Sequence, residues 1–180
     1  GAFAGAAAGY MLCNPWLSFI IGGLAGGLFA LVHALATVTF NADHTISGVA
    51  INLLAPGVAL FASKIMFDGA TMTPTIPMEQ KIPRPLNGLF PSGSILDTIF
   101  NAYATVFIAF ILVAITWYVL YKTKFGLRIR AVGEHPGAAD TLGISVAKTR
   151  YAAVIISGIL AGLGGASMSL AVVSSFRPTL

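Results

Sequence analysis

Residues 17–40, LSFIIGGLAGGLFALVHALATVTF, decide the fold class of this chain. The stretch is apolar almost throughout and holds a single ionisable side chain, His33. At about 1.5 Å of rise per residue, a helix of this length crosses a hydrocarbon core of about 30 Å. A helix is required because backbone N–H and C=O groups find no water at that depth. The stretch therefore predicts a transmembrane helix.

Three further spans of the same character are expected at 45–67, 102–121 and 151–176, and apolar residues 1–12 read as the end of another span. Of the 180 residues, 57% are hydrophobic and 9% charged, whereas soluble domains carry about 25% charged residues. The chain begins at Gly1 without the basic flank of a signal peptide. We therefore interpret it as an internal fragment of one domain, an all-α, polytopic transmembrane helix bundle.

The loops predict the orientation of the bundle. Residues 68–101 are rich in proline, whereas residues 122–150 hold six of the ten Lys and Arg residues. By the positive-inside rule the basic loop is cytoplasmic and the proline loop external, which puts the short link at 41–44 on the cytoplasmic side. Because most cations sit in one loop and not on an extended basic face, the net charge of +4 does not predict a nucleic-acid partner.

Glycines repeat every four residues inside the spans, as in Gly22 with Gly26, Gly23 with Gly27, and Gly158 with Gly162. Small residues at this spacing let helix backbones approach closely in a bilayer. We expect them to pack helices within one subunit; a dimer seam and a substrate-lining face are the alternatives.

Polar residues in the span 45–67 and in the link before it are candidates for a substrate path. Ser47 and Asn52 precede a proline, Pro56, in the span 45–67, and Asn41 lies in the link before it. Proline kinks or breaks a helix, and broken helices at membrane depth often line transport sites. The alternative is a kinked structural helix whose Asn52 bonds to a neighbour. For His33, an interhelical hydrogen bond is favoured over a role in a pore.

The basic loop contains a second predicted feature, a short helix from about Pro136 to Leu142. Proline suits the first helical turn, and Gly143 suits the position after the last. A short helix with the small residues Ala138 and Ala139 could dock in a groove of another protein, but a solvated loop fits the residues equally well. The chain has no GxxxxGK[ST] phosphate-binding loop, a single cysteine, Cys13, and no metal-binding spacing of histidines. No cofactor is therefore expected in it.

A longer stretch, Thr123 to Ala166, resembles the signature region of ABC-importer permeases of the branched-chain amino acid, ribose and simple-sugar superfamily. The resemblance rests on Phe125-Gly126, Arg130 to Glu134, Pro136, Ala139, Gly143-Ile144, Ser157-Gly158 and Ala161 to Gly165. It implies a coupling helix that docks on a separate cytoplasmic ATPase subunit, where ATP is bound. The residues it assigns to this contact are Glu134, Pro136, Ala138, Ala139, Gly143 and Ile144.

Residues 43–57, DHTISGVAINLLAPG, are similar to the matching segment of nucleoside importers that work with basic membrane lipoproteins. Those permeases usually carry a Gln near the position of His44 or Thr45, so this chain departs from them there. The resemblance implies a multi-pass subunit of the bacterial inner membrane that pairs with a second permease and receives nucleosides from an external binding lipoprotein. A permease for ribose-like sugars is the alternative within the superfamily.

Other functional classes fit the sequence less well. A proton-coupled secondary transporter needs acidic residues at membrane depth, and no Asp or Glu lies within any predicted span. A membrane enzyme needs a convergent catalytic set, which the sequence does not contain. A purely structural component would not need the helix bracketed by cations.

Overall fold

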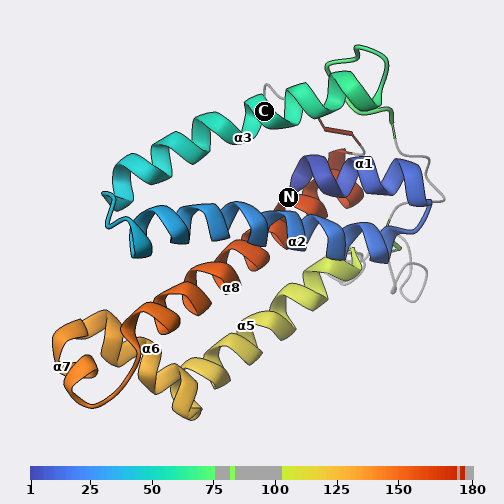
Figure 1. Ribbon diagram of the computed structural model, residues 1–180. Helices are drawn as coiled ribbons and strands as arrows, with labels where there is room; N and C mark the ends of the chain where they lie inside the picture. Colours follow the sequence, from blue (N-terminus) through green and yellow to red (C-terminus); the bar gives the residue numbers. More distant parts are fainter. Residues whose placement is uncertain (76–81, 84–102, 174, 177–180) are drawn as a thin grey trace, which may run out of the picture.

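A computed structural model describes residues 1–75, 82–83, 103–173 and 175–176, and all elements in this part of the chain are helical (Figure 1). Four continuous helical stretches, Pro15–Thr39, His44–Met66, Ala104–Lys122 and Val146–Val173, are long and apolar enough to cross a membrane. The elements are α1 (Ala2–Leu12), α2 (Pro15–Ala34), the π-helical turn η1 (Leu35–Thr39), α3 (His44–Met66), α5 (Ala104–Lys122), α6 (Lys124–Glu134), α7 (Pro136–Thr141), α8 (Val146–Ser167) and the π-helical turn η3 (Met168–Val173). The expected all-α, multi-pass membrane fold is confirmed.

The glycine repeats bring α2 and α8 together as an antiparallel pair. A Cβ on Gly26 would lie 2.4 Å from the carbonyl oxygen of Gly158 and 2.6 Å from Cα of Gly162. One turn away, a Cβ on Gly22 would lie 2.4 Å from Cβ of Ala166. The two four-residue ladders therefore run in opposite directions with the backbones in contact. Packing within one subunit, the favoured interpretation of these glycines, is confirmed.

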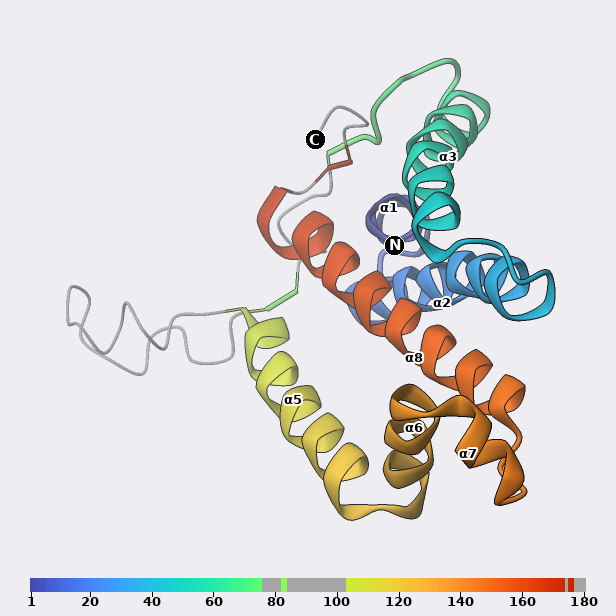
Figure 2. The same ribbon diagram turned by 90° about the vertical axis from the view of Figure 1, so that its left-hand side faces the viewer.

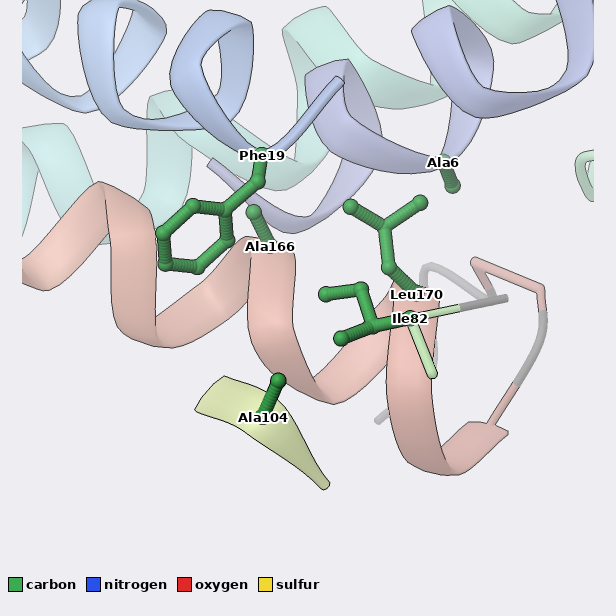
Figure 3. Close-up of a cluster of buried hydrophobic side chains, with 6 residues drawn as sticks. All are labelled: Ala6, Phe19, Ile82, Ala104, Ala166 and Leu170. Atoms are coloured by element: carbon green, nitrogen blue, oxygen red, sulfur yellow. The ribbon is translucent and has the colours of Figure 1, made fainter. Parts of the chain in front are cut away.

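Helix α1 completes this tight group. Ser169, in the turn η3 that follows α8, donates a hydrogen bond of 3.0 Å to the carbonyl oxygen of Ala2. Beside it a small apolar cluster joins distant segments of the chain (Figure 3). Its members are Ala6, Phe19, Ile82, Ala104, Ala166 and Leu170. The cluster fixes the ends of α1, α2, α5 and α8 opposite the basic loop.

Helices α3 and α5 diverge from the group, one on each side (Figure 1). Helix α3 is continuous through Pro56, so the proline does not break it. Proline still removes one backbone donor, which leaves the carbonyl oxygen of Asn52, four residues earlier, without its usual helical partner. The proline therefore removes one backbone hydrogen bond at Pro56 but leaves α3 a single continuous helix.

The basic segment contains more helix than the sequence predicted. The short helix expected at 136–142 is present as α7. The residues before it form another helix, α6, and α8 already begins at Val146, within the segment expected to be loop. The link between α2 and α3 lies at the same end of the bundle as α6 and α7 (Figure 1), as the orientation from charge requires. Most of the proline loop expected at 68–101 lies outside the described residues.

Candidate functional sites: a membrane cavity and a cytoplasmic helix

A cavity of about 590 Å³ lies between α3 on one side and α1, α2 and α8 on the other. Small residues of the packed helices form most of its wall, and Phe3 and Phe29 add aromatic surface. Two polar side chains, His33 of α2 and Asn52 of α3, also line it. The cavity thus offers hydrogen-bonding groups and aromatic faces at membrane depth, which a polar organic solute needs.

His33 ties the two walls of the cavity together. Its Nδ1 lies 2.9 Å from Oγ of Ser47, which is 9% exposed. The ring of His44 meets the His33 ring edge-on, with centroids 6.4 Å apart. His33 therefore makes the interhelical hydrogen bond expected of it, and it also borders the cavity.

The three predicted path residues occupy different places. Asn52 lines the cavity, whereas Ser47 is bonded to His33 and is not among the lining residues. Asn41 lies in the link between η1 and α3, with φ of 50°, outside the cavity. Phe29 also lines the cavity, but it was not among the predicted path residues. The sequence does not show whether a phenylalanine of a membrane-spanning helix faces a cavity or the lipid.

The N-terminal end of α3 is held by Asp43. Its carboxylate accepts hydrogen bonds from the backbone N–H of Thr45, at 2.8 Å, and of Ile46, at 3.0 Å. These bonds, that of Ile46 foremost, hold the pKa of Asp43 below its usual value. An ionised cap thus fixes the helix that forms one wall of the cavity.

Helix α7 has a defined start and a defined end. His135 precedes it, and its Nδ1 accepts a hydrogen bond of 3.1 Å from the backbone N–H of Ala138. Gly143 ends it with φ of 76°, a conformation that favours glycine. The N–H of Ile144 then bonds back to the carbonyl oxygen of Ala139 at 3.1 Å. The chain therefore leaves α7 in a fixed direction.

The residues assigned to a partner contact lie in α7 and on both sides of it in the chain, and they differ in exposure. Ala139 is 2% exposed and packs inward, and Pro136 and Ile144 are half-buried. Glu134, Ala138 and Gly143 are exposed. Leu142, which the sequence did not single out, is 79% exposed. The exposed residues of this region thus include one large apolar side chain, Leu142, beside the small residues Ala138 and Gly143.

The segment around α7 is also connected to the membrane-spanning helices. The hydroxyl groups of Thr39 in η1 and Tyr151 in α8 are hydrogen-bonded. Val38 of η1 and Pro136 of α7 line one small polar cavity together with Arg150. Helix α7 and the end of η1 therefore face each other across this cavity, and η1 is bonded directly to α8. In the described part of the chain, no three His, Cys, Asp or Glu side chains gather as a metal site requires.

Comparison with known proteins places these features in a family context. Residues 1–178 match the family described as "Branched-chain amino acid transport system / permease component". The guanosine ABC transporter permease protein NupQ of Bacillus subtilis is 49% identical over 84% of this chain and 47% of its own length. No solved structure matches the chain significantly.

Further relatives carry related names. The nucleoside ABC transporter permease protein NupC of Lactococcus lactis is 39% identical over 91% of this chain and 51% of its own length. The galactose/methyl galactoside import permease protein MglC of Haemophilus influenzae is 27% identical over 78% of this chain and 39% of its own length. The chain thus spans about half the length of the nucleoside permeases that it matches.

Proposed function

Because this chain belongs to the permease component family of branched-chain amino acid transport systems, we propose that it forms one wall of the translocation path of an ATP-driven nucleoside importer. The cavity bordered by His33, Asn52 and Phe29 is the observation that carries this proposal. An amide and an imidazole can hydrogen-bond the edge of a nucleobase, and an aromatic ring can stack on its face. The names of the relatives NupQ and NupC favour the same cargo.

The energy for transport enters through α7. Cytoplasmic ATP-binding subunits dock on the exposed residues in and around α7, which are Glu134 at the end of α6, Ala138 in α7 and Leu142 directly after it, while Ala139 secures the helix from within. ATP is bound and hydrolysed on those subunits, and this chain supplies no ATPase site. Their closure moves α7, and the Tyr151–Thr39 hydrogen bond passes the movement to α2.

The complete importer contains further subunits. A second permease subunit supplies the opposite wall of the path, since alternating access places the substrate site between two bundles. An external binding lipoprotein delivers the nucleoside at the face opposite α6 and α7. The cations of α6 and the start of α8 orient the chain with these helices in the cytoplasm of a bacterial inner membrane.

A permease for simple sugars is the second candidate, because the relative MglC is named for galactose import. Sugar hydroxyl groups can also hydrogen-bond to His33 and Asn52. The two cargoes are therefore separated by competition between guanosine and free sugars for uptake.

The test is uptake of labelled guanosine into vesicles that hold the assembled importer, with its binding lipoprotein outside and ATP inside. We expect ATP-dependent uptake that excess guanosine inhibits and excess ribose or galactose does not. Asn52→Ala should reduce uptake at least ten-fold, the effect of about 1.4 kcal/mol, whereas Leu53→Ala, a control at a 75%-exposed neighbour, should not. Uptake that runs on a proton gradient without ATP would refute the proposal, as would inhibition by sugars alone.

A further inference from the structure

A second cavity, of about 540 Å³, lies on the other side of the packed helices, between α5 and α8. It extends along α5 from Thr105 to Tyr121, and its lining is apolar apart from a few hydroxyl groups. Figure 2 shows α5 and α8 diverging, with α6 between them at one end. At about 1.5 Å per residue this groove is roughly 24 Å long, close to the height of the hydrocarbon core.

At the Tyr121 end of the groove, α6 packs against the end of α5. The chain turns back after α5, and a Cβ on Gly126 would lie 2.4 Å from Cα of Leu120, so only glycine fits at this contact. The turn is fixed by Thr123, whose hydroxyl group donates to the carbonyl oxygen of Val119 at 2.6 Å and accepts from the N–H of Gly126 at 3.2 Å. Helix α6 is therefore held against the end of α5.

Two cations stand over aromatic rings that line this end of the groove. Nζ of Lys122 lies 5.8 Å from the centre of the Trp117 ring, and Cζ of Arg130 lies 5.0 Å from the centre of the Tyr121 ring. Both rings line the groove. Helices α5 and α6 contain one acidic residue, Glu134, at the far end of α6. An apolar groove with a cationic rim at one end is complementary to a phospholipid, whose apolar acyl chains carry an anionic headgroup at one end.

We propose that this groove binds an anionic phospholipid of the cytoplasmic leaflet. One acyl chain lies between α5 and α8, and the phosphate lies between Lys122 and Arg130. Tryptophan and tyrosine favour the headgroup level of a membrane, and basic pockets on the cytoplasmic side of helix pairs recognise anionic headgroups. The site lies across α8 from the cavity assigned to cargo, so it does not depend on which solute is transported.

The groove contains its own reporter. The chain has two tryptophans, Trp16 and Trp117, so a Trp16→Phe variant leaves the groove tryptophan as the source of tryptophan fluorescence in this chain. In phosphatidylcholine nanodiscs, small fractions of phosphatidylglycerol brominated near the headgroup should quench Trp117, and the same fractions of brominated phosphatidylcholine should quench it much less. If other subunits with tryptophans are needed for assembly, quenching is compared with a Trp117→Phe sample.

The charge requirement is tested on the rim. One interacting Lys or Arg near an anionic surface changes affinity about five-fold, so Lys122→Gln with Arg130→Gln should raise the half-quenching fraction of phosphatidylglycerol about 30-fold. Lys148→Gln is the matched control and should leave it unchanged, because Lys148 lies at the start of α8 on the same side of the membrane, whereas Lys122 and Arg130 stand over the aromatic rings that line the groove. Equal quenching by both lipids, or no effect of the double substitution, would overturn the proposal.

The apolar requirement is tested at Gly164, which lines the groove and whose added Cβ would meet nothing within 4 Å. Gly164→Leu should fill the groove and abolish selective quenching. Gly57→Leu is its control, because Gly57 is equally open but lies on α3. Displacement of the lipid by millimolar inorganic phosphate would show a free-phosphate site and overturn the proposal. So would a cross-link from Gly164→Cys, made in a Cys13→Ser background, to another protein helix, because protein would then occupy the groove.

Discussion

Gly26→Ala tests the feature on which both cavities depend, the direct backbone contact of α2 with α8. The new Cβ would lie 2.4 Å from the carbonyl oxygen of Gly158 and 2.6 Å from Cα of Gly162. Ordinary carbon contacts lie at about 3.5–4.0 Å, and backbone atoms cannot rotate away as a side-chain end can. The helices must therefore separate by about 1 Å, and overpacking of this kind costs about 1–3 kcal/mol.

A control must remove the contribution of helix propensity, because alanine favours a helix over glycine by up to about 1 kcal/mol. Gly57→Ala provides it, since Gly57 is also inside a membrane-spanning helix and its added Cβ would meet nothing within 4 Å. The propensity gain is common to both variants. The free energy of unfolding of Gly26→Ala should therefore lie about 1–3 kcal/mol below that of Gly57→Ala.

The assay is equilibrium unfolding of the purified membrane protein in mixed micelles of a mild detergent and dodecyl sulfate, followed by circular dichroism. A second substitution, Gly162→Ala, enters the same contact, because its Cβ would lie 2.6 Å from the carbonyl oxygen of Gly22. Helices already separated by the first substitution accept the second at lower cost, so the double variant should lose less than the sum of the single losses. Equal stability of Gly26→Ala and Gly57→Ala would refute the packing of α2 on α8.

Three further predictions concern the coupling residues, the substrate path and the cap of α3. Gly143→Ala places a side chain at φ of 76°, which costs about 1 kcal/mol or more and should change the direction in which the chain leaves α7. Glu134→Ala removes the exposed carboxylate at the end of α6, just before α7. Both variants should insert normally but lower substrate-stimulated ATP hydrolysis by the assembled importer, and normal import rates would contradict the coupling role. In a Cys13→Ser background, Asn52→Cys should react with a water-soluble thiol reagent, and substrate should protect it. Ser47→Cys should react more slowly, because position 47 is buried against His33. Equal reaction rates at the two positions would place Ser47 in the path. The pKa of Asp43 is lowered in the folded chain, so its contribution to stability is complete above the unfolded-state value near 4 and is lost as the pH falls through the lower folded value; amide exchange at the start of α3 should rise there, but not in Asp43→Asn, which keeps a neutral cap.

Periodic features of the sequence predicted the fold well. The four-residue spacing of glycines predicted close helix packing within the subunit, because any helix places such residues on one face; which two helices meet, α2 and α8, came from the structure. Pro136 and Gly143 marked both ends of α7 for an equally local reason. Helix α6 was missed, since KFGLRIRAVGE reads as a basic connection. It is a helix because Thr123 caps it and Gly126 packs on α5, and this packing cannot be read from local sequence.

The predicted path residues show where sequence reasoning ends. Ser47 and Asn52 are both polar residues of one predicted helix, and nothing local separates their roles. The difference comes from a partner 14 residues earlier, because His33 engages Ser47 and leaves Asn52 facing the cavity. Helical phase orders residues around an axis, but only the neighbouring helix determines which polar group is already satisfied. The assignment of both residues to a substrate path stays a prediction.

Hydrogen bonds connect α2 and the π-helical turn that continues it to two other helices. Thr39, the last residue of η1, is bonded to Tyr151 of α8. About two turns earlier, His33 is bonded to Ser47 of α3 and borders the cavity. Single π-helical turns often mark functional sites, and η1 lies just after His33 in the chain. The end of α2 is therefore tied both to α8, which follows α7 in the chain, and to the polar wall of the cavity, in addition to the glycine contacts that hold α2 against α8.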